Sequence, residues 1–270
     1  MKLSVTAWSF PVLSLDEVGG LAKVLGIDAI DVSFFYASAL DRAKVLGSPD
    51  AYGEELRRRV PVDIASFYYL FGNGLDERNL ALGPNGDNLA DFQNVLRFTR
   101  AAGADNVFIL PGLINPGQSR GQAIANSAEA LKPLVEAGNK AGVTVTIEPH
   151  VHGILESVDA VHDICAKVPG LKIVLDLAHF TALGYRQEEI ETLAPLAGHV
   201  HLRQARQGAL QSKMEQGTIN FPSLFAALRD AGYDGGLAIE FVHQAYMDTL
   251  YDDVLTETVK MRDTFRAWSR

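Results

Sequence analysis

The sequence is poor in cysteine and in positive charge, and it has no long hydrophobic run. Its one cysteine, Cys165, cannot form an internal disulfide, and the apolar helical pattern around it is typical of a buried, inert thiol. Lys and Arg number 24 against 33 Asp and Glu, so the chain, at a formal net charge of -9, repels nucleic acid and acidic membranes. No stretch approaches the ~18 uninterrupted apolar residues of a membrane span, and the first residues lack a signal-like run. We therefore expect a cytoplasmic protein with no nucleic-acid partner and no membrane partner.

A glycine-rich nucleotide-binding turn is also absent. No G-x-G-x-x-G follows a strand-like run, and the first such run leads into WSFPVLS. This disfavours a doubly wound open sheet, which usually carries that turn after its first strand. The 47% hydrophobic and 21% charged residues are ordinary for a globular protein. A length of 270 residues fits one α/β barrel, although length alone also allows two domains of about 130 residues.

Short β-branched runs alternate with longer helical patterns eight times along the chain. Among the helical patterns, Ser14 and Glu17 form a capping box, Gly103 marks a helix end, and Asn220 can cap a helix with Pro222 in its first turn. Strands separated by helices pair in parallel, so eight such units predict a closed (β/α)8 TIM barrel, with residues 1–270 as a single domain. The strand-like runs begin at Leu3, Ile27, Val62, Asn106, Val143, Leu171, His199 and Leu237.

The last four predicted strands end in residue types that bind metals. The carboxyl ends of barrel strands converge on one mouth, so Glu148, Asp176, His201 and Glu240 should meet there. Taken singly, each carboxylate could instead cap a helix or form an ion pair. Taken together, three carboxylates and one imidazole predict a site for one divalent metal ion, with Mn²⁺ or Mg²⁺ favoured and Co²⁺ or Zn²⁺ as alternatives.

The strings TIEPH, LDLAHF, GHVHLRQA, EQGTINF and GYDGGLAIEF resemble, in order and spacing, the xylose isomerase-like barrel superfamily. This superfamily contains sugar isomerases, ketose 3-epimerases, inosose dehydratases and apurinic endonucleases. The resemblance covers the whole chain, with its specific motifs in the second half. It implies that Glu148, Asp176, His201 and Glu240 are the metal ligands and that His179 contacts the substrate. It also implies a small-molecule carbohydrate substrate and a homo-oligomer, since dimers and tetramers are common in the family.

A divalent ion that chelates a carbonyl and a neighbouring hydroxyl would acidify the C–H between them by stabilising an enediolate. Glu148 and Glu240, on opposite sides of that carbon, would then act as an acid/base pair. Return of the proton on the other face is an epimerisation, and its return to the adjacent carbon is an isomerisation. Loss of a β-hydroxyl would instead make the protein a dehydratase, acting on a keto-polyol or a dehydroshikimate-type acid, which is the main alternative.

Two positions depart from the ketose 3-epimerase pattern. Gln207 stands where those enzymes carry an arginine, and Ile154 stands where they carry a further glutamate. The sequence HLRQARQGALQ resembles instead a bacterial branch described broadly as sugar phosphate isomerase/epimerase. An apurinic endonuclease is disfavoured because no histidine precedes His150, and a noncatalytic sugar-binding barrel is disfavoured because none of the four ligands is missing.

Further residues near the predicted strand ends are candidates for substrate binding. Arg203 and Arg206 could bind a phosphate or carboxylate through their planar guanidinium groups, and His150 lies close enough to the mouth to contact substrate. His152 is read as a loop residue. His199 is expected to point away from the ion and to be structural. Trp8 could form an apolar wall for a sugar ring, as could other aromatic residues that are more often found in a core: Phe10, Phe34, Phe35, Phe67, Tyr68, Tyr69 and Tyr246.

Overall fold

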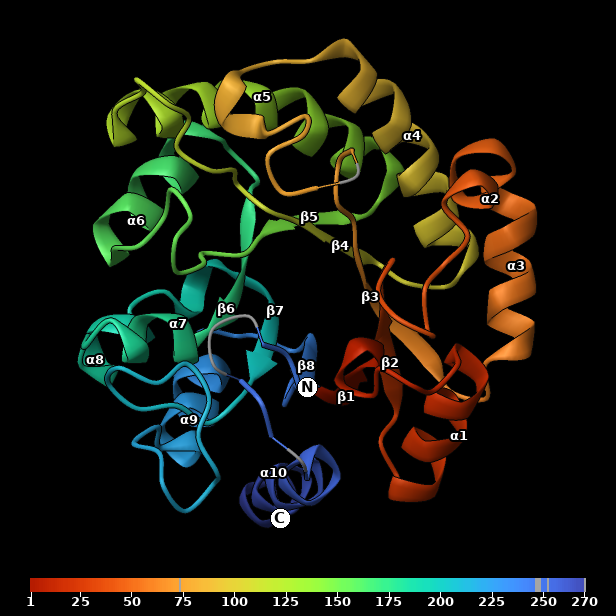
Figure 1. Cartoon of the computed structure of the whole chain (residues 1–270), viewed down its shortest axis with the longest axis vertical. Coiled ribbons are helices and arrows are strands. Elements are labelled where there is room, and N and C mark those ends of the chain that lie inside the picture. Colours follow the sequence, from red (N-terminus) through yellow and green to blue (C-terminus); the bar gives the residue numbers. More distant parts are fainter. Residues whose placement is uncertain (73, 246–248, 252, 270) are drawn as a thin grey trace.

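Eight parallel strands close into a barrel in which each strand pairs with the next along the chain and the last pairs with the first (Figure 1). This computed structural model describes residues 1–72, 74–245, 249–251 and 253–269. The strand-like runs match the observed strands to within two residues at either end, which confirms the predicted (β/α)8 barrel. The strands are β1 (Lys2–Thr6), β2 (Ala29–Val32), β3 (Asp63–Tyr68), β4 (Asn106–Ile109), β5 (Thr144–Ile147), β6 (Lys172–Asp176), β7 (Ala197–Leu202) and β8 (Gly236–Ile239).

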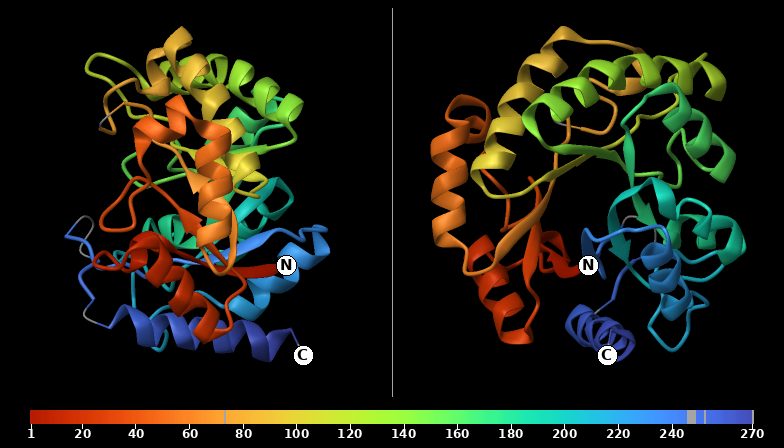
Figure 2. Two further views of the ribbon diagram at one scale, coloured as in Figure 1. Left: turned by 90° about the vertical axis from the view of Figure 1, so that its right-hand side faces the viewer. Right: turned by 180° about the vertical axis from the view of Figure 1, so that it is seen from behind.

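The helices form a ring outside the strands (Figure 1). The loops that follow the strands gather on one side of the barrel, whereas the start of β1 and the end of the last helix lie on the other (Figure 2). No helix in the described part of the chain is both long and apolar enough to cross a membrane. The helices are α1 (Leu15–Leu25), α2 (Arg42–Gly47), α3 (Pro49–Arg59), α4 (Gly86–Ala101), α5 (Arg120–Ala141), α6 (Val158–Lys167), α7 (Leu177–Ala182), α8 (Gln187–Glu191), α9 (Phe221–Asp230) and α10 (Val254–Trp268), with short 3-10 turns η1 (Ala7–Ser9), η2 (Leu80–Leu82) and η3 (Ala194–Leu196).

The local helix signals in the sequence act as predicted. The Ser14 hydroxyl accepts from the Glu17 amide and the Glu17 carboxylate accepts from the Ser14 amide, so the capping box starts α1. Gly103 adopts a φ of 87° just after α4, a left-handed conformation that suits glycine. Asn220 caps α9 by accepting from the Ser223 amide. These caps end or begin helices where the chain must turn between the outer ring and the barrel.

The barrel interior contains several hydrogen-bonded polar side chains. Ser4 Oγ donates to Asp31 Oδ1 at 2.9 Å, Ser66 Oγ donates to Asn106 Oδ1 at 2.6 Å, and Asn106 Nδ2 donates to Thr146 Oγ1 at 3.4 Å. All five side chains are buried, and these hydrogen bonds offset the cost of their desolvation. Because side chains alternate along a strand, the intervening residues face outward. They form the main apolar core beneath the helices, as Val5, Ile30, Val107, Ile147 and Leu175 do.

Cys165, on α6, is half-buried against this core. Burial raises the pKa of its thiol to about 11, although the nearby charge of Lys172 opposes the shift. A thiol with this pKa stays protonated at neutral pH and is a poor nucleophile.

Close packing of α5 on the barrel gives a test of the fold. At Gly138 an added Cβ would clash with Val145 Cγ2 and lie 2.8 Å from the Val143 carbonyl oxygen. We expect Gly138→Ala to lower the free energy of unfolding by about 1–3 kcal/mol in urea titrations. Gly121, in the first turn of the same helix, would have no heavy atom within 4 Å of an added Cβ, so Gly121→Ala should be neutral or stabilising by about 0.4–1 kcal/mol. Equal stabilities for the two variants would contradict this packing.

Candidate metal centre and active site

The four predicted ligands converge at the mouth of the barrel. Glu148 follows β5, Asp176 ends β6, His201 lies near the end of β7, and Glu240 follows β8. One oxygen or nitrogen atom from each lies within 4.8 Å of those of the other three, and all four residues are buried. His201 Nδ1 is 2.9 Å from Glu148 Oε1 and 3.2 Å from Glu240 Oε2. Four strand ends that are far apart in sequence therefore form one compact cluster.

Arg203 is a permanent cation in contact with this cluster. Its Nη2 lies 2.5 Å from Asp176 Oδ2 and 3.3 Å from Glu240 Oε2, and the side chain is 6% exposed. The cluster holds three carboxylates, so one guanidinium leaves two negative charges to be balanced when His201 is neutral. Uncompensated charge is costly to bury. The site is therefore built to hold additional positive charge.

The pKa shifts of the cluster residues reflect this excess of negative charge. Burial alone would lower the pKa of His201, but the charges of Glu240 and Glu148 raise it well above its usual value. Burial alone would raise the pKa of Glu240, but His201 and Arg203 lower it to about 2. Burial raises the pKa of Asp176, although the charge of Arg203 opposes this shift. Without another cation, His201 carries a proton, and its positive charge helps to balance the negative charge of the carboxylates.

Two histidines lie beside the cluster. His179, on α7, is 2% exposed, and its Nε2 is 3.6 Å from Asp176 Oδ2 and 3.3 Å from Arg203 Nη2. Burial, followed by the electrostatic effects of His150 and Arg203, lowers the pKa of His179 well below its usual value, so its imidazole is neutral. The His150 ring packs on it with centroids 4.1 Å apart. Both rings can exchange hydrogen bonds with a polar ligand.

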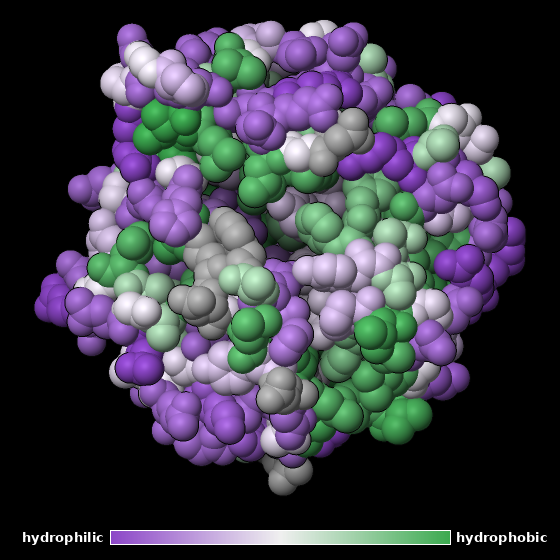
Figure 3. All heavy atoms as spheres, in the orientation of Figure 1, coloured by the Kyte–Doolittle hydropathy of each residue, from purple (hydrophilic) through white to green (hydrophobic). Residues whose placement is uncertain are grey.

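A cavity of about 380 Å³ opens above the cluster. Figure 3 shows a hollow at the centre of this face with hydrophobic side chains along its border. One wall is aromatic, formed by Trp8, Phe35 and Tyr68, and the Trp8 indole donates to Glu240 Oε1 at 2.8 Å. The long loop after β3 contributes Gly74 and Leu75 to the lining. The cavity therefore combines an apolar wall with a charged floor.

Several predicted contacts lie elsewhere. Arg206 is exposed and does not line this cavity, whereas His152 is an exposed loop residue, as predicted. Tyr246 lies outside the described residues. The aromatic residues that pack into the main core instead of the cavity wall are Phe10, Phe34, Phe67 and Tyr69. Sequence position alone did not separate these residues from Phe35 and Tyr68.

The expectation that His199 faces away from the metal ligands is wrong. Residues two apart on a strand point to the same face, so His199 and His201 both lie inside the barrel. Their ring centroids are 5.6 Å apart, and His199 Nε2 lies 2.6 Å from Asp31 Oδ2. Asp31 was missed by the sequence reasoning, although a carboxylate inside the apolar strand IDAIDV is a signal that could have found it.

Residues 20–260 match the family model described as xylose isomerase-like TIM barrel. The chain belongs to this family. A 2-oxo-tetronate isomerase of Cupriavidus necator is 25% identical over 228 residues, which cover 80% of this chain and 82% of that protein. An L-ribulose 3-epimerase structure has a TM-score of 0.74 at 17% identity, covering 99% of this chain and 94% of the other. The IolI protein with a bound zinc atom has a TM-score of 0.74 at 18% identity, covering 99% of each chain.

The residues of this xylose isomerase-like barrel fit a divalent ion. Three carboxylates and one imidazole nitrogen form an oxygen-rich donor set that suits Mn²⁺ or Mg²⁺ and is acceptable to Zn²⁺. Glu240 Oε2 is buried and has no hydrogen-bond partner among the described residues. A divalent cation would balance the two negative charges that Arg203 leaves uncompensated.

We expect the purified barrel to bind about one divalent ion per chain. Asp176→Asn and His201→Ala should each lose the bound ion. Each should lower the affinity for the ion by more than the roughly 10–100-fold that is typical when a residue hydrogen-bonded to a metal ligand is changed. Affinity should weaken as pH falls, because the ion must displace a proton from His201. Metal analysis after dialysis and calorimetric Mn²⁺ titration measure both effects, with Glu156→Gln as a control. Wild-type protein that binds no divalent ion would refute the site.

Proposed function

We propose that the protein is a divalent-metal-dependent isomerase or epimerase of a small carbohydrate. The observation that carries this proposal is the convergence of Glu148 and Glu240 on His201 Nδ1, at 2.9 and 3.2 Å, beneath a cavity of about 380 Å³. That volume lies in the range of small-molecule sites. The family assignment and the named isomerase among its relatives support the same class of reaction.

Glu148, Asp176, His201 and Glu240 would hold the ion. When bound, a divalent ion supplies a Lewis acid that stabilises negative charge developing on substrate oxygens. Asp176 is oriented for this role because its Oδ1 accepts from the Ala178 amide, which leaves Oδ2 toward the cluster. Each ligand is thus fixed by its strand end rather than by a mobile loop.

Glu148 and Glu240 would be the acid/base pair. They follow β5 and β8, which are not neighbours in the barrel, so the two carboxylates approach the cavity from different directions. His201 and Arg203 keep the Glu240 carboxylate ionised by lowering its pKa, and the Trp8 indole donates to its Oε1 and restrains it. One carboxylate would remove the proton from the carbon beside a carbonyl. The other would return it on the opposite face or to the adjacent carbon.

The lining favours a sugar without a phosphate group. Among the described lining residues, Arg203 is the one arginine, and it already pairs with Asp176 and Glu240. Arg206, which could have supplied a second guanidinium, is exposed outside the cavity. We propose that the aromatic wall packs against the C–H face of the sugar while His150 and His179 bond its hydroxyl groups. Arg203 would contact a hydroxyl or carboxylate of the substrate.

Exchange of a substrate C–H with deuterated solvent tests the shared step. Ketoses, aldoses and inososes, each with and without phosphate, are incubated with enzyme and Mn²⁺ and followed by NMR. The wild type should exchange one C–H, and Glu240→Gln should reduce the rate by roughly 100-fold or more, in line with loss of a general base. Glu156→Gln, which alters a carboxylate outside the cavity, should exchange normally.

Metal content separates the two roles of Glu240. The Glu240→Gln variant is assayed at saturating Mn²⁺ and its bound Mn²⁺ is measured, so that loss of exchange in a metal-loaded variant reports the proton-transfer role. Unchanged exchange in that variant would remove Glu240 from the mechanism. A product lighter than the substrate by one water would identify the dehydratase alternative, since isomerisation and epimerisation leave the mass unchanged.

A further inference from the structure

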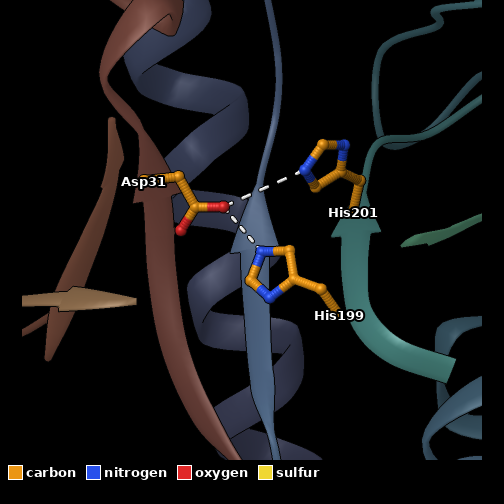
Figure 4. Close-up of side chains that lie close together, drawn as sticks. All are labelled: Asp31, His199 and His201. Atoms are coloured by element: carbon orange, nitrogen blue, oxygen red, sulfur yellow. Dashed lines mark hydrogen bonds and ion pairs between the residues drawn. The ribbon is translucent and has the colours of Figure 1, made fainter. Parts of the chain in front are cut away.

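Asp31 is a fully buried carboxylate inside the barrel, below the proposed metal centre. It projects from β2 toward His199 and His201 on β7 (Figure 4). Its Oδ1 accepts from Ser4 Oγ at 2.9 Å, and its Oδ2 lies 2.6 Å from His199 Nε2. The same Oδ2 is 3.9 Å from His201 Nε2. Asp31 therefore links the polar interior of the barrel to a proposed metal ligand.

The two ring nitrogens of His201 face different partners. Nδ1 points to Glu148 and Glu240, whereas Nε2 points to Asp31. Nε2 is buried and has no hydrogen-bond partner among the described residues, since 3.9 Å exceeds hydrogen-bond length. A histidine that binds a metal through one nitrogen generally donates its other N–H to a carboxylate or carbonyl, which sets the tautomer and the ring orientation. Asp31 is placed to accept from Nε2 after a small rotation of the ring.

His199 and Ser4 hold Asp31 in this place. The hydrogen bonds from these two side chains use both carboxylate oxygens, so the carboxylate cannot turn away without losing one of them. The His199 ring has room because residue 236 is glycine, where an added Cβ would lie 3.0 Å from His199 Cε1. The arrangement joins β1, β2 and β7 around one acceptor. Asp31 is thus fixed relative to the backbone that carries His201.

We propose that Asp31 is a positioning residue for the metal centre. Held by Ser4 and His199, it would accept from His201 Nε2 once the ring has turned to close the 3.9 Å gap, and it would thereby present Nδ1 to the ion. This inference rests on the proposed metal-dependent function. A second cation would be the competing occupant of this place, because donor atoms of Asp31, His199 and His201 lie within 4.8 Å of one another. Because Asp31 and His199 are already hydrogen-bonded to each other at 2.6 Å, the positioning role is favoured over a second cation site.

The test compares Mn²⁺ affinities of the intact protein by calorimetry, together with the visible absorption of the Co²⁺-loaded form. Asp31→Asn keeps the side-chain shape and should weaken Mn²⁺ binding by roughly 10–100-fold and alter the Co²⁺ absorption bands. Ser4→Ala removes one hydrogen bond to Asp31 and should weaken binding less, by roughly threefold to tenfold. The matched control is Ser66→Ala, since Ser66 is equally buried in the barrel but bonds to Asn106. It should leave the Mn²⁺ affinity unchanged even if it lowers thermal stability.

The outcomes separate this inference from the proposed function. If the wild type binds no Mn²⁺, the proposed metal centre itself fails. If the wild type binds Mn²⁺ and a folded Asp31→Asn variant binds it equally well, the positioning role is overturned and the metal centre stands. Should Asp31→Asn not fold, unchanged affinity in Ser4→Ala overturns the role. An equal loss in Ser66→Ala, or two ions per wild-type chain, also overturns it.

Discussion

The confinement of three carboxylates in the buried mouth of the barrel is the constraint on which the arrangement of the site depends. Glu148, Asp176 and Glu240 lie so close together that their negative charges repel one another unless positive charge lies among them. Arg203 supplies one such charge, and the Trp8 indole supplies a hydrogen bond. A divalent cation would balance the remainder. In that case metal binding and the stability of the mouth depend on the same electrostatic interactions.

Much of this architecture could be predicted because it depends on local patterns and on one rule of topology. Eight apolar runs separated by helical patterns require a parallel sheet, and the barrel brings the carboxyl end of every strand to one mouth. The four candidate ligands could therefore be named from their places at strand ends. Their convergence needed no knowledge of side-chain geometry, since Glu148 and Glu240 each follow directly on a buried strand.

The directions and contacts of side chains inside the barrel could not be predicted in the same way. Phe34 and Phe35 are adjacent in sequence, as are Phe67 and Tyr68, yet one member of each pair packs in the core and the other lines the cavity. Phe34 and Phe35 lie in the loop after β2, and Phe67 and Tyr68 follow the point where the register of β3 against β2 shifts, so simple strand alternation does not say which member faces inward. The pairing of Asp31 with His199, 168 residues away, likewise depends on β2 and β7 facing each other across the closed barrel.

The polar side chains inside the barrel also bear on how the strands find their register during folding. An apolar face tolerates a shifted pairing, because one β-branched side chain packs much like another. Asp31 is less tolerant, since a one-residue slip of β2 would turn its carboxylate into the apolar layer beneath the helices and leave His199 without its acceptor. The hydrogen bond from Ser66 to Asn106 imposes a similar penalty on β3 and β4. The polar interior around the candidate site thus lowers the stability of a barrel that closes in the wrong register.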